Sequence, residues 1–187
     1  TVDPEIIIKN YGADSVRLFI LSDSPPEKDV QWSEEGIKSS YKFLNKLWDL
    51  NLRIKNHLAR DYEKDPDNEL EKFTNKYVKK VSDNLNNFSY NIIIANLHEI
   101  YSFLNKIIEK KYSKNSMIKN YTKILTIISP IIPHFAYECL KDINVNEKLN
   151  WPKYDEGLLI ENLVPFVIQI NGKKRDLIQI KRDSKEE

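Results

Sequence analysis

The sequence predicts a mainly α-helical fold, an antiparallel helical bundle followed by a short β-hairpin. Across residues 33–143, apolar side chains recur three and four positions apart, in segments separated by short polar stretches. Only 4 glycines occur among the 187 residues, which argues against a turn-dense all-β fold. After residue 152, β-rich runs flank Asn171-Gly172, a dipeptide typical of hairpin turns.

Two short helices are predicted before residue 24. Asp3-Pro4-Glu5 has the order of a helix start, with a capping acid, a proline and an acid in the first turn. Gly12 is expected to end this helix, and a second is expected over about residues 14–21. Pro25-Pro26 then predicts a loop over residues 22–32.

The clearest periodicity lies in the next helix, which Ser33-Glu34-Glu35 begins and which is expected to reach about Leu58. Its two adjacent apolar stripes cover roughly half of the circumference at about 100° per residue. The stripes are Phe43, Leu47, Leu50 and Ile54, and Ile37, Tyr41, Leu44 and Trp48. The opposite side carries Lys38, Lys42, Lys46 and Arg53, interrupted by Asp49. We therefore expect a core helix with a mostly basic outer face.

Four further helices are predicted after a charged linker at residues 61–67. They are expected from about Asn68 to Leu85, from a Ser89 cap to about Lys111, from about Ser116 to Ile128, and from Pro133 to just before Asn144. Because the connections are short, neighbouring helices are expected to pack antiparallel.

The net charge and the cysteine content limit the partners. With 29 basic and 28 acidic residues the net charge is +1, so a nucleic-acid partner would have to use a local patch. The single Cys139 cannot form an internal disulfide, which fits a reducing cytosol and a cytoplasmic location. No apolar run approaches the roughly 20 residues that span a bilayer, so no membrane partner is expected.

Nothing in the residues themselves indicates catalysis. His57, His98 and His134 lie on different predicted elements, and no Cys or His pair shows ligand spacing, so no metal is expected. Cys139 near His134 suggests a thiol nucleophile, but no positioning residue is evident and a buried cysteine is the simpler interpretation. The chain also lacks phosphate-loop and dinucleotide motifs, so no cofactor is expected within it.

Basic residues provide the best functional signal. Lys38, Lys42 and Lys46 stand one turn apart, about 6 Å, close to the spacing of successive phosphates. Lys173-Lys174-Arg175 follows the predicted hairpin turn, and a weaker cluster comprises Lys106, Lys110, Lys111 and Lys114. From the pattern alone, an ordinary solvated face is the simpler interpretation of the helix. Among the tryptophans, Trp48 belongs to the apolar stripe, whereas Trp32 and Trp151 are expected to attach loops to the bundle.

Several segments resemble leucyl-tRNA synthetases. Tyr11-Gly12-Ala13-Asp14-Ser15-Val16-Arg17-Leu18 matches the Tyr-Gly-Ala-Asp-x-x-Arg-Leu segment that class I synthetases for leucine, isoleucine and valine share. Ser24-Pro25-Pro26-Glu27 with Asp29 and Trp32-Ser33 is similar to the leucine enzymes in particular, and Tyr41–Trp48 continues the likeness. Ser129–His134 resembles the start of the last bundle helix. The His-Ile-Gly-His and Lys-Met-Ser-Lys-Ser signatures of the catalytic domain are absent.

The resemblance implies a domain plan. Residues 1–32 would connect a catalytic domain to the bundle, residues 33–150 would form a helical domain of the anticodon-binding type, and residues 151–187 would begin a truncated C-terminal α/β domain. The parent enzyme would use ATP and Mg to attach leucine to tRNA(Leu). This part would dock the tRNA body, contact the catalytic and editing domains of the same chain, act as a monomer, and be inactive alone.

The charge pattern and the resemblance together give the candidate residues, and the resemblance favours Lys42 and Lys46 because they lie in the best-matching segment. The candidate tRNA contacts are Lys38, Lys42, Lys46, Arg53, Lys173, Lys174 and Arg175, and the residues of the structural motif are Tyr11, Gly12, Asp14, Arg17, Trp32, Trp48 and His134. Asp14 is expected to cap the second helix, and Arg17 fits a structural role that pins two helices together. Two alternatives stay open: the equivalent part of an isoleucine or valine enzyme, which residues 24–33 disfavour, and a free-standing helical protein-interaction module without an RNA role.

Overall fold

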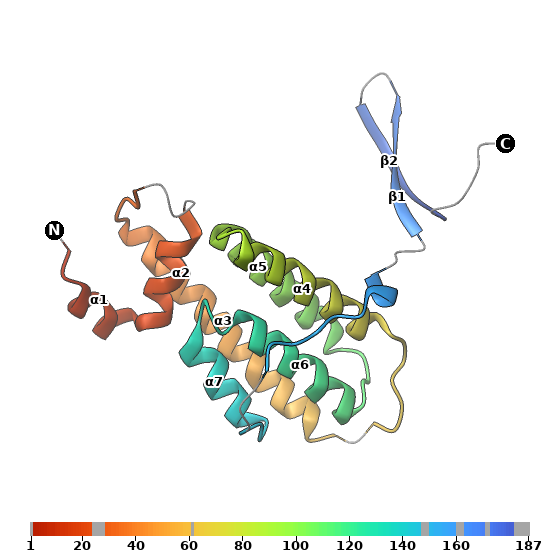
Figure 1. Ribbon diagram of the computed structural model, residues 1–187, viewed down its shortest axis with the longest axis horizontal. Helices are drawn as coiled ribbons and strands as arrows, with labels where there is room; N and C mark the ends of the chain where they lie inside the picture. The colour runs from red at the N-terminus through yellow and green to blue at the C-terminus, as the bar shows by residue number, and fades with distance from the viewer. Residues whose placement is uncertain are drawn as a thin grey trace. The chain divides into compact units, whose positions relative to one another are not determined.

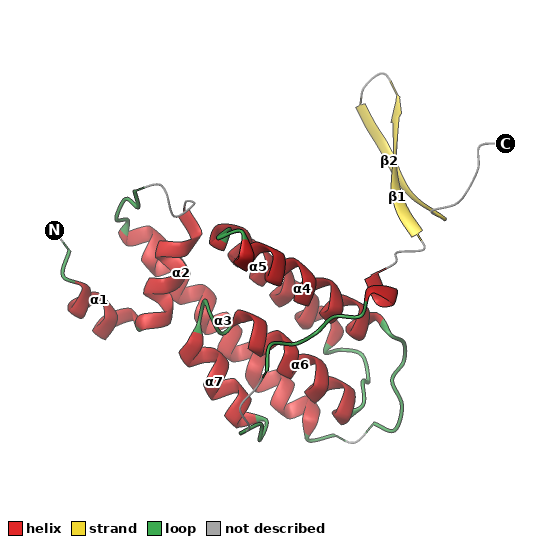
Figure 2. Ribbon diagram, viewed as in Figure 1, coloured by secondary structure: helices red, strands yellow, loops and turns green. Residues whose placement is uncertain are grey.

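The computed structural model describes residues 2–23, 29–60, 62–146, 150–159, 163–170 and 173–181. The chain divides into two compact units, Thr1–Tyr154 and Asp155–Glu187. Within the described residues, all the α-helices belong to the first unit, and the second contains a short 3₁₀ helix and two strands (Figures 1 and 2). The mainly α-helical prediction is therefore confirmed.

The first unit has seven α-helices in its described part. They are α1 (Pro4–Tyr11), α2 (Ala13–Asp23), α3 (Glu34–Leu58), α4 (Glu69–Asn86), α5 (Tyr90–Ile107), α6 (Lys114–Ile128) and α7 (Pro133–Asp142). Helix α3 contacts α5, α6 and α7, α4 packs between α5 and α6, and α2 rests on α3, α5 and α7 (Figure 1). No helix in the described part of the chain is long and apolar enough to cross a membrane.

The helices from α3 through α7 share one hydrophobic core. The apolar stripes of α3 supply several of its members, and the innermost side chains are less than 2% exposed. Among these are Ile54, Leu70, Ile93, Leu97, Ile100, Met117, Ile124 and Leu125. The burial of these stripes is the main source of cohesion, since each large aliphatic side chain contributes about 1.5–3 kcal/mol when removed from water.

The predicted caps of α1 and α3 are present. The Asp3 carboxylate accepts a hydrogen bond from the Glu5 N–H at 2.9 Å, and the Ser33 hydroxyl accepts one from the Gly36 N–H at 3.1 Å. Gly12 ends α1 with φ at 81°, a backbone conformation that side-chain-bearing residues rarely adopt, and its N–H donates to the Ile8 carbonyl.

The boundaries around α5 differ from the prediction. Helix α5 ends at Ile107 rather than near Lys111, because Tyr112 turns into the core and is only 1% exposed there. Ser113 then caps α6 by accepting from the Ser116 N–H, so α6 begins two residues earlier than predicted. Ser89 does not cap α5 with its side chain.

The second unit contains η1 (Glu156–Leu159) and an antiparallel pair of strands, β1 (Leu163–Ile170) and β2 (Lys173–Lys181). The register pairs Ile168 with Asp176 and Gln169 with Lys174, which leaves Arg175 as the extra residue of a β-bulge. The predicted turn at Asn171-Gly172 lies outside the described residues. The assignment of this pair to a hairpin of an incomplete C-terminal domain therefore stays a prediction.

Candidate nucleic-acid interface

The basic face of α3 contains two kinds of cation. Lys42 and Lys46 are exposed, and neither has a hydrogen-bond or ion-pair partner among the described residues. Lys38 pairs with Glu34 at 3.3 Å, with side chains 54% and 76% exposed. Arg53 donates to Asn105 Oδ1 and pairs with Glu109 at 3.0 Å, which ties α3 to α5. Two of the four predicted cations on α3 thus have no competing partner within the described ranges.

The face of α3 next to Lys46 is aromatic. The Phe43 ring stacks on the His98 imidazole of α5, with centroids 3.8 Å apart and planes inclined by 24°. Burial and, to a lesser degree, the charge of Lys46 lower the pKa of His98. His98 is therefore neutral at pH 7, with one ring nitrogen as donor and the other as acceptor.

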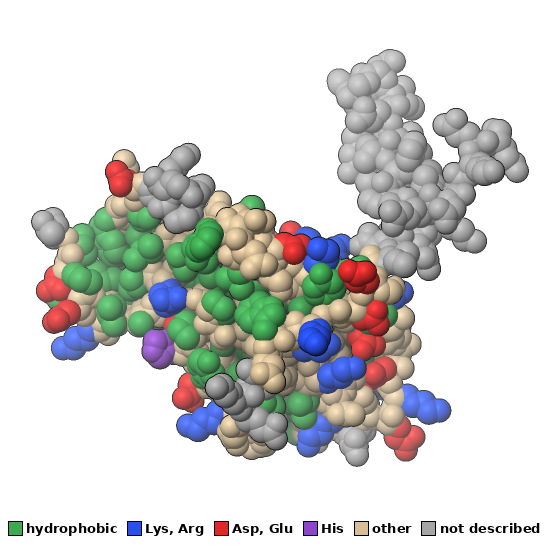
Figure 3. Space-filling model, in the orientation of Figure 1, with side chains coloured by type: hydrophobic (Ala, Val, Ile, Leu, Met, Phe, Trp, Pro, Cys, Tyr) green, Lys and Arg blue, Asp and Glu red, His purple; other side chains and the backbone are tan. Residues whose placement is uncertain are grey.

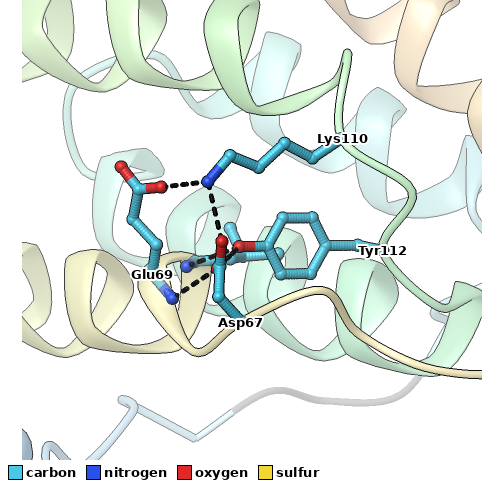
Figure 4. A network of polar contacts seen from close by, with 5 residues as sticks. Asp67, Glu69, Lys110 and Tyr112 are labelled. Carbon is cyan, nitrogen blue, oxygen red and sulfur yellow. Dashed lines mark hydrogen bonds and ion pairs between the residues drawn. The ribbon is translucent and has the colours of Figure 1, made fainter.

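The other predicted basic clusters differ in their surroundings. In β2, Arg175 is exposed, whereas the side chains of Lys173 and Lys174 lie outside the described part of the structure. Lys110 pairs with Asp67 at 2.7 Å and with Glu69, as Figure 4 shows, so it is not a free cation. Tyr112 also donates to Asp67 in this network, which attaches the charged linker before α4 to the end of α5.

Asp14 of α2 contacts α7, a helix that is distant from α2 in the sequence. Its carboxylate accepts from the backbone N–H of Phe135 at 2.7 Å, from the His134 N–H at 3.4 Å and from His134 Nδ1 at 2.9 Å. Ile132 occupies the cap position of α7 and has no side-chain acceptor, so Asp14 supplies the cap from α2. The prediction that Asp14 caps its own helix is therefore wrong. Only 4% of Asp14 is exposed, and the α7 dipole favours its negative charge.

Arg17 completes the same junction one turn further along α2. Its Nε donates to the Ile131 carbonyl at 2.8 Å and its Nη2 to the Pro130 carbonyl at 2.6 Å. These two carbonyls belong to the turn between α6 and α7, so Arg17 holds two elements together, as the structural interpretation expects. We call Asp14, Arg17 and the segment they hold, residues 130–135, the α2–α7 junction.

The other motif residues support this arrangement with aromatic contacts. Tyr11 meets Tyr41 of α3 edge-on at 5.7 Å, and Trp32 meets Phe19 of α2 edge-on at 5.3 Å. Trp48 packs on Phe135 at 4.8 Å, which continues the α2–α7 junction into the core.

Cys139 and His134, the pair considered for nucleophilic catalysis, have structural surroundings. Cys139 is buried, and burial raises the pKa of its thiol to about 12, so it remains protonated at pH 7. Asp14 holds the His134 ring in the α2–α7 junction. Within the described ranges, no three His, Cys, Asp or Glu side chains gather closely enough to hold a metal ion.

Comparison with known proteins gives the family. A family model described as the anticodon-binding domain of tRNA ligase matches residues 67–187. The chain belongs to this family. The matched segment begins at Asp67, directly before α4, so the first three helices lie ahead of it.

Relatives named leucine–tRNA ligase match the first three helices as well. That of Wolbachia pipientis subsp. Culex pipiens (strain wPip) is 36% identical over 193 residues, covering 100% of this chain and 23% of the relative. That of Prochlorococcus marinus (strain MIT 9515) is 34% identical, covering 100% of this chain and 22% of the relative. The expected resemblance to leucyl-tRNA synthetases is thus confirmed along the whole chain, which spans less than a quarter of the length of these relatives.

A solved structure shares the fold. It is a crystal structure of LeuRS from Agrobacterium radiobacter K84 in a ternary complex with tRNA and LeuAMS. The TM-score is 0.80 at 20% sequence identity, and the match covers 99% of this chain and 25% of the LeuRS chain.

The α2–α7 junction predicts a large effect of a single substitution. Asp14→Ala leaves the first N–H groups of α7 without an acceptor, so we expect the free energy of unfolding to fall by about 1–3 kcal/mol. Urea denaturation followed by circular dichroism measures it. Asp49→Ala, at an exposed position of α3, is the control and should change stability by less than about 0.5 kcal/mol. Equal stabilities of the two variants would contradict the trans cap.

The linker network predicts a pH dependence. Hydrogen bonds from Lys110, and then from Tyr112, lower the pKa of Asp67 to about 2. An unfolded Asp titrates near about 3.9, so the ionised network stabilises the fold above about pH 4 and loses this contribution as the pH falls toward 2.

Asp67→Asn should therefore lower the free energy of unfolding more at pH 6 than at pH 2.5. Because the Asp67 side chain is 38% exposed, solvent screening limits the difference to below about 1 kcal/mol. Urea denaturation of both proteins at both pH values measures it. A loss of the same size at the two values would show that the carboxylate does not titrate as described.

Proposed function

We propose that the chain is the tRNA-docking part of a leucine–tRNA ligase and that the basic face of α3 contacts the tRNA backbone. The observation that carries the proposal is the pair Lys42 and Lys46, exposed and without partners in the described chain. The two cations stand about 6 Å apart along the helix axis on a rigid, buried scaffold. Phosphate contacts of this kind position RNA and do not read its sequence.

The flanking cations Lys38 and Arg53 would have secondary roles. The exposed pair between Lys38 and Glu34 contributes only about 0.3–0.5 kcal/mol, so Lys38 can exchange its partner for a phosphate at little cost. Arg53 is held by both Asn105 and Glu109, which restricts its reach. In β2, Arg175 would extend the contacts with Lys173 and Lys174 toward the tRNA elbow.

The two ends of the chain would connect to other parts of the parent. Residues 1–32 would join a catalytic domain to the bundle of residues 33–150. Apolar side chains on α1 and α2 are exposed, with Ile6 at 55%, Ile8 at 44% and Ile20 at 46%. Figure 3 shows hydrophobic side chains gathered at this end of the helical unit. Such a patch fits a contact with the catalytic or editing domain of the same chain.

Residues 151–187 would begin a C-terminal α/β domain with a hairpin. Two strands alone are marginally stable in water, which supports their completion by further structure. The parent enzyme would use ATP and Mg to charge tRNA(Leu) with leucine in the cytoplasm as a monomer. The described part of the bundle supplies docking to that reaction and no acid, base or nucleophile.

Charge reversal on α3 tests this proposal. Lys42→Glu with Lys46→Glu should weaken binding of a leucine-accepting tRNA transcript by at least about tenfold, since two ion contacts become repulsive. Fluorescence anisotropy at 100 mM salt, about the ionic strength at which the screening length is 10 Å, measures the affinity. Helical content should not change, because both side chains are exposed.

The matched control reverses Lys111 and Lys114, two exposed lysines beyond the end of α5. This variant has the same net charge, so general electrostatics predicts equal effects for the two pairs, whereas docking on α3 predicts a loss for Lys42 and Lys46 only. Neutral Gln variants at Lys42 and Lys46 should also reduce the salt dependence of log K by about 1.4–1.8. Equal losses for both charge-reversed pairs would refute the choice of surface.

A further inference from the structure

A hollow of about 510 Å³ opens between α2, α3 and α5, beside the basic face. Its size falls within the roughly 300–1,000 Å³ typical of small-ligand pockets. Helix α2 contacts both α3 and α5, so the walls come from these three packed helices and from residues 31–33, which directly precede α3 (Figure 1). The lining combines aromatic rings (Phe19, Trp32, Phe43 and His98) with hydroxyl and amide groups (Ser39, Ser40 and Gln31).

Gly36 makes the aromatic wall possible. A Cβ atom on Gly36 would lie 2.5 Å from Cε2 and 2.9 Å from Cδ2 of Phe19, well inside van der Waals contact. The missing side chain lets Phe19 approach α3, and Phe19 in turn supports the Trp32 ring edge-on at 5.3 Å. Trp32 is 38% exposed, so one part of its ring remains accessible at the hollow.

Several polar groups of the lining have no hydrogen-bond partner in the part of the chain that the structure describes. Ser39, Ser40, Gln31 and the ring nitrogens of His98 make no hydrogen bond with another described residue, in contrast to Ser22 and Ser33. The lowered pKa of His98 leaves its imidazole neutral, so the hollow offers both donors and acceptors without a buried charge. The lining therefore places aromatic rings beside hydrogen-bond donors and acceptors that have no partner among the described residues. This combination suits a flat heterocycle with a polar edge.

The positive charge next to the hollow identifies the ligand class further. Ser39 lies one helical turn from Lys42 on α3, and Lys46 acts on His98 at the lining. A phosphate held by Lys42 or Lys46 would therefore carry its base to the mouth of the hollow. Proteins that read single-stranded RNA combine these two features, a cationic track for the backbone and aromatic surfaces for the bases.

We propose that the hollow between α2, α3 and α5 receives one unstacked nucleobase of the bound tRNA, whose phosphate lies on Lys42 and Lys46. The proposal rests on the proposed function, because it places the base next to the same docking surface. It adds a contact that can discriminate among bases at one position. The nucleotide must come from a single-stranded loop or end, where the base is not paired.

The test uses Trp32 as a reporter in the full chain. Trp48→Phe and Trp151→Phe leave Trp32 as the single tryptophan. Titration with a leucine-accepting tRNA transcript should quench Trp32 emission with the same affinity that anisotropy reports. Ser40→Leu fills the hollow, and it should abolish the quenching and weaken binding by about tenfold, the range of one stacked base. Asn115→Leu, at an exposed position of α6, should change neither signal.

The outcomes separate this proposal from the proposed function. If the transcript binds with a steep salt dependence while Trp32 emission and the Ser40→Leu affinity stay unchanged, the base pocket is refuted and backbone docking stands. That result would assign the hollow to a protein segment of the parent. If no salt-dependent binding occurs at all, both proposals fail. Ser40→Ala, which removes the hydroxyl without filling the space, separates loss of a polar contact from loss of volume.

Discussion

Asp14 and Arg17 hold α2 against the turn that leads into α7, across more than a hundred residues of sequence. The carboxylate caps a helix that has no cap of its own, and the guanidinium satisfies two carbonyls that the α6–α7 turn leaves free. Because α2 also rests on α3 and α5, this junction fixes the position of the helix that forms one wall of the hollow and borders the basic face. Loss of either polar contact would therefore disturb the position of α2 and, through it, the surface that we assign to RNA.

Some cations of the helical unit are paired with acidic side chains, and others are not paired among the residues that the structure describes. Two cations at the α5–α6 end, Lys110 and Lys119, have acidic neighbours, and these pairs attach α4 to the segment after α5 and to α6. Lys42 and Lys46 at the other end have no such neighbours in the described chain, and they flank an aromatic and hydroxyl-lined hollow. A near-neutral protein can bind a polyanion in this way, because paired charges leave a local excess on one face.

Periodicity and capping residues predicted the helical bundle, the caps at Asp3 and Ser33, and the core stripes of α3 except for Tyr41, which is 39% exposed. They did not predict where α5 ends, because Tyr112 buries its ring through contacts with distant residues and no local signal marks such a contact. The partner of Asp14 was missed for the same reason: a capping residue identifies itself in sequence, but the helix that it caps across space does not. Likewise, Ser39 and His98 became candidates only when the fold placed them in one hollow.

The most direct test of the account is a footprint of lysine reactivity. The chain would be labelled with an amine-specific reagent, with and without a leucine-accepting tRNA transcript, and each lysine would be quantified by mass spectrometry. The account predicts strong protection of Lys42 and Lys46 and no protection of Lys111 and Lys114, all four of which are exposed in the free chain. Protection of Lys111 and Lys114 with full reactivity at Lys42 and Lys46 would contradict it.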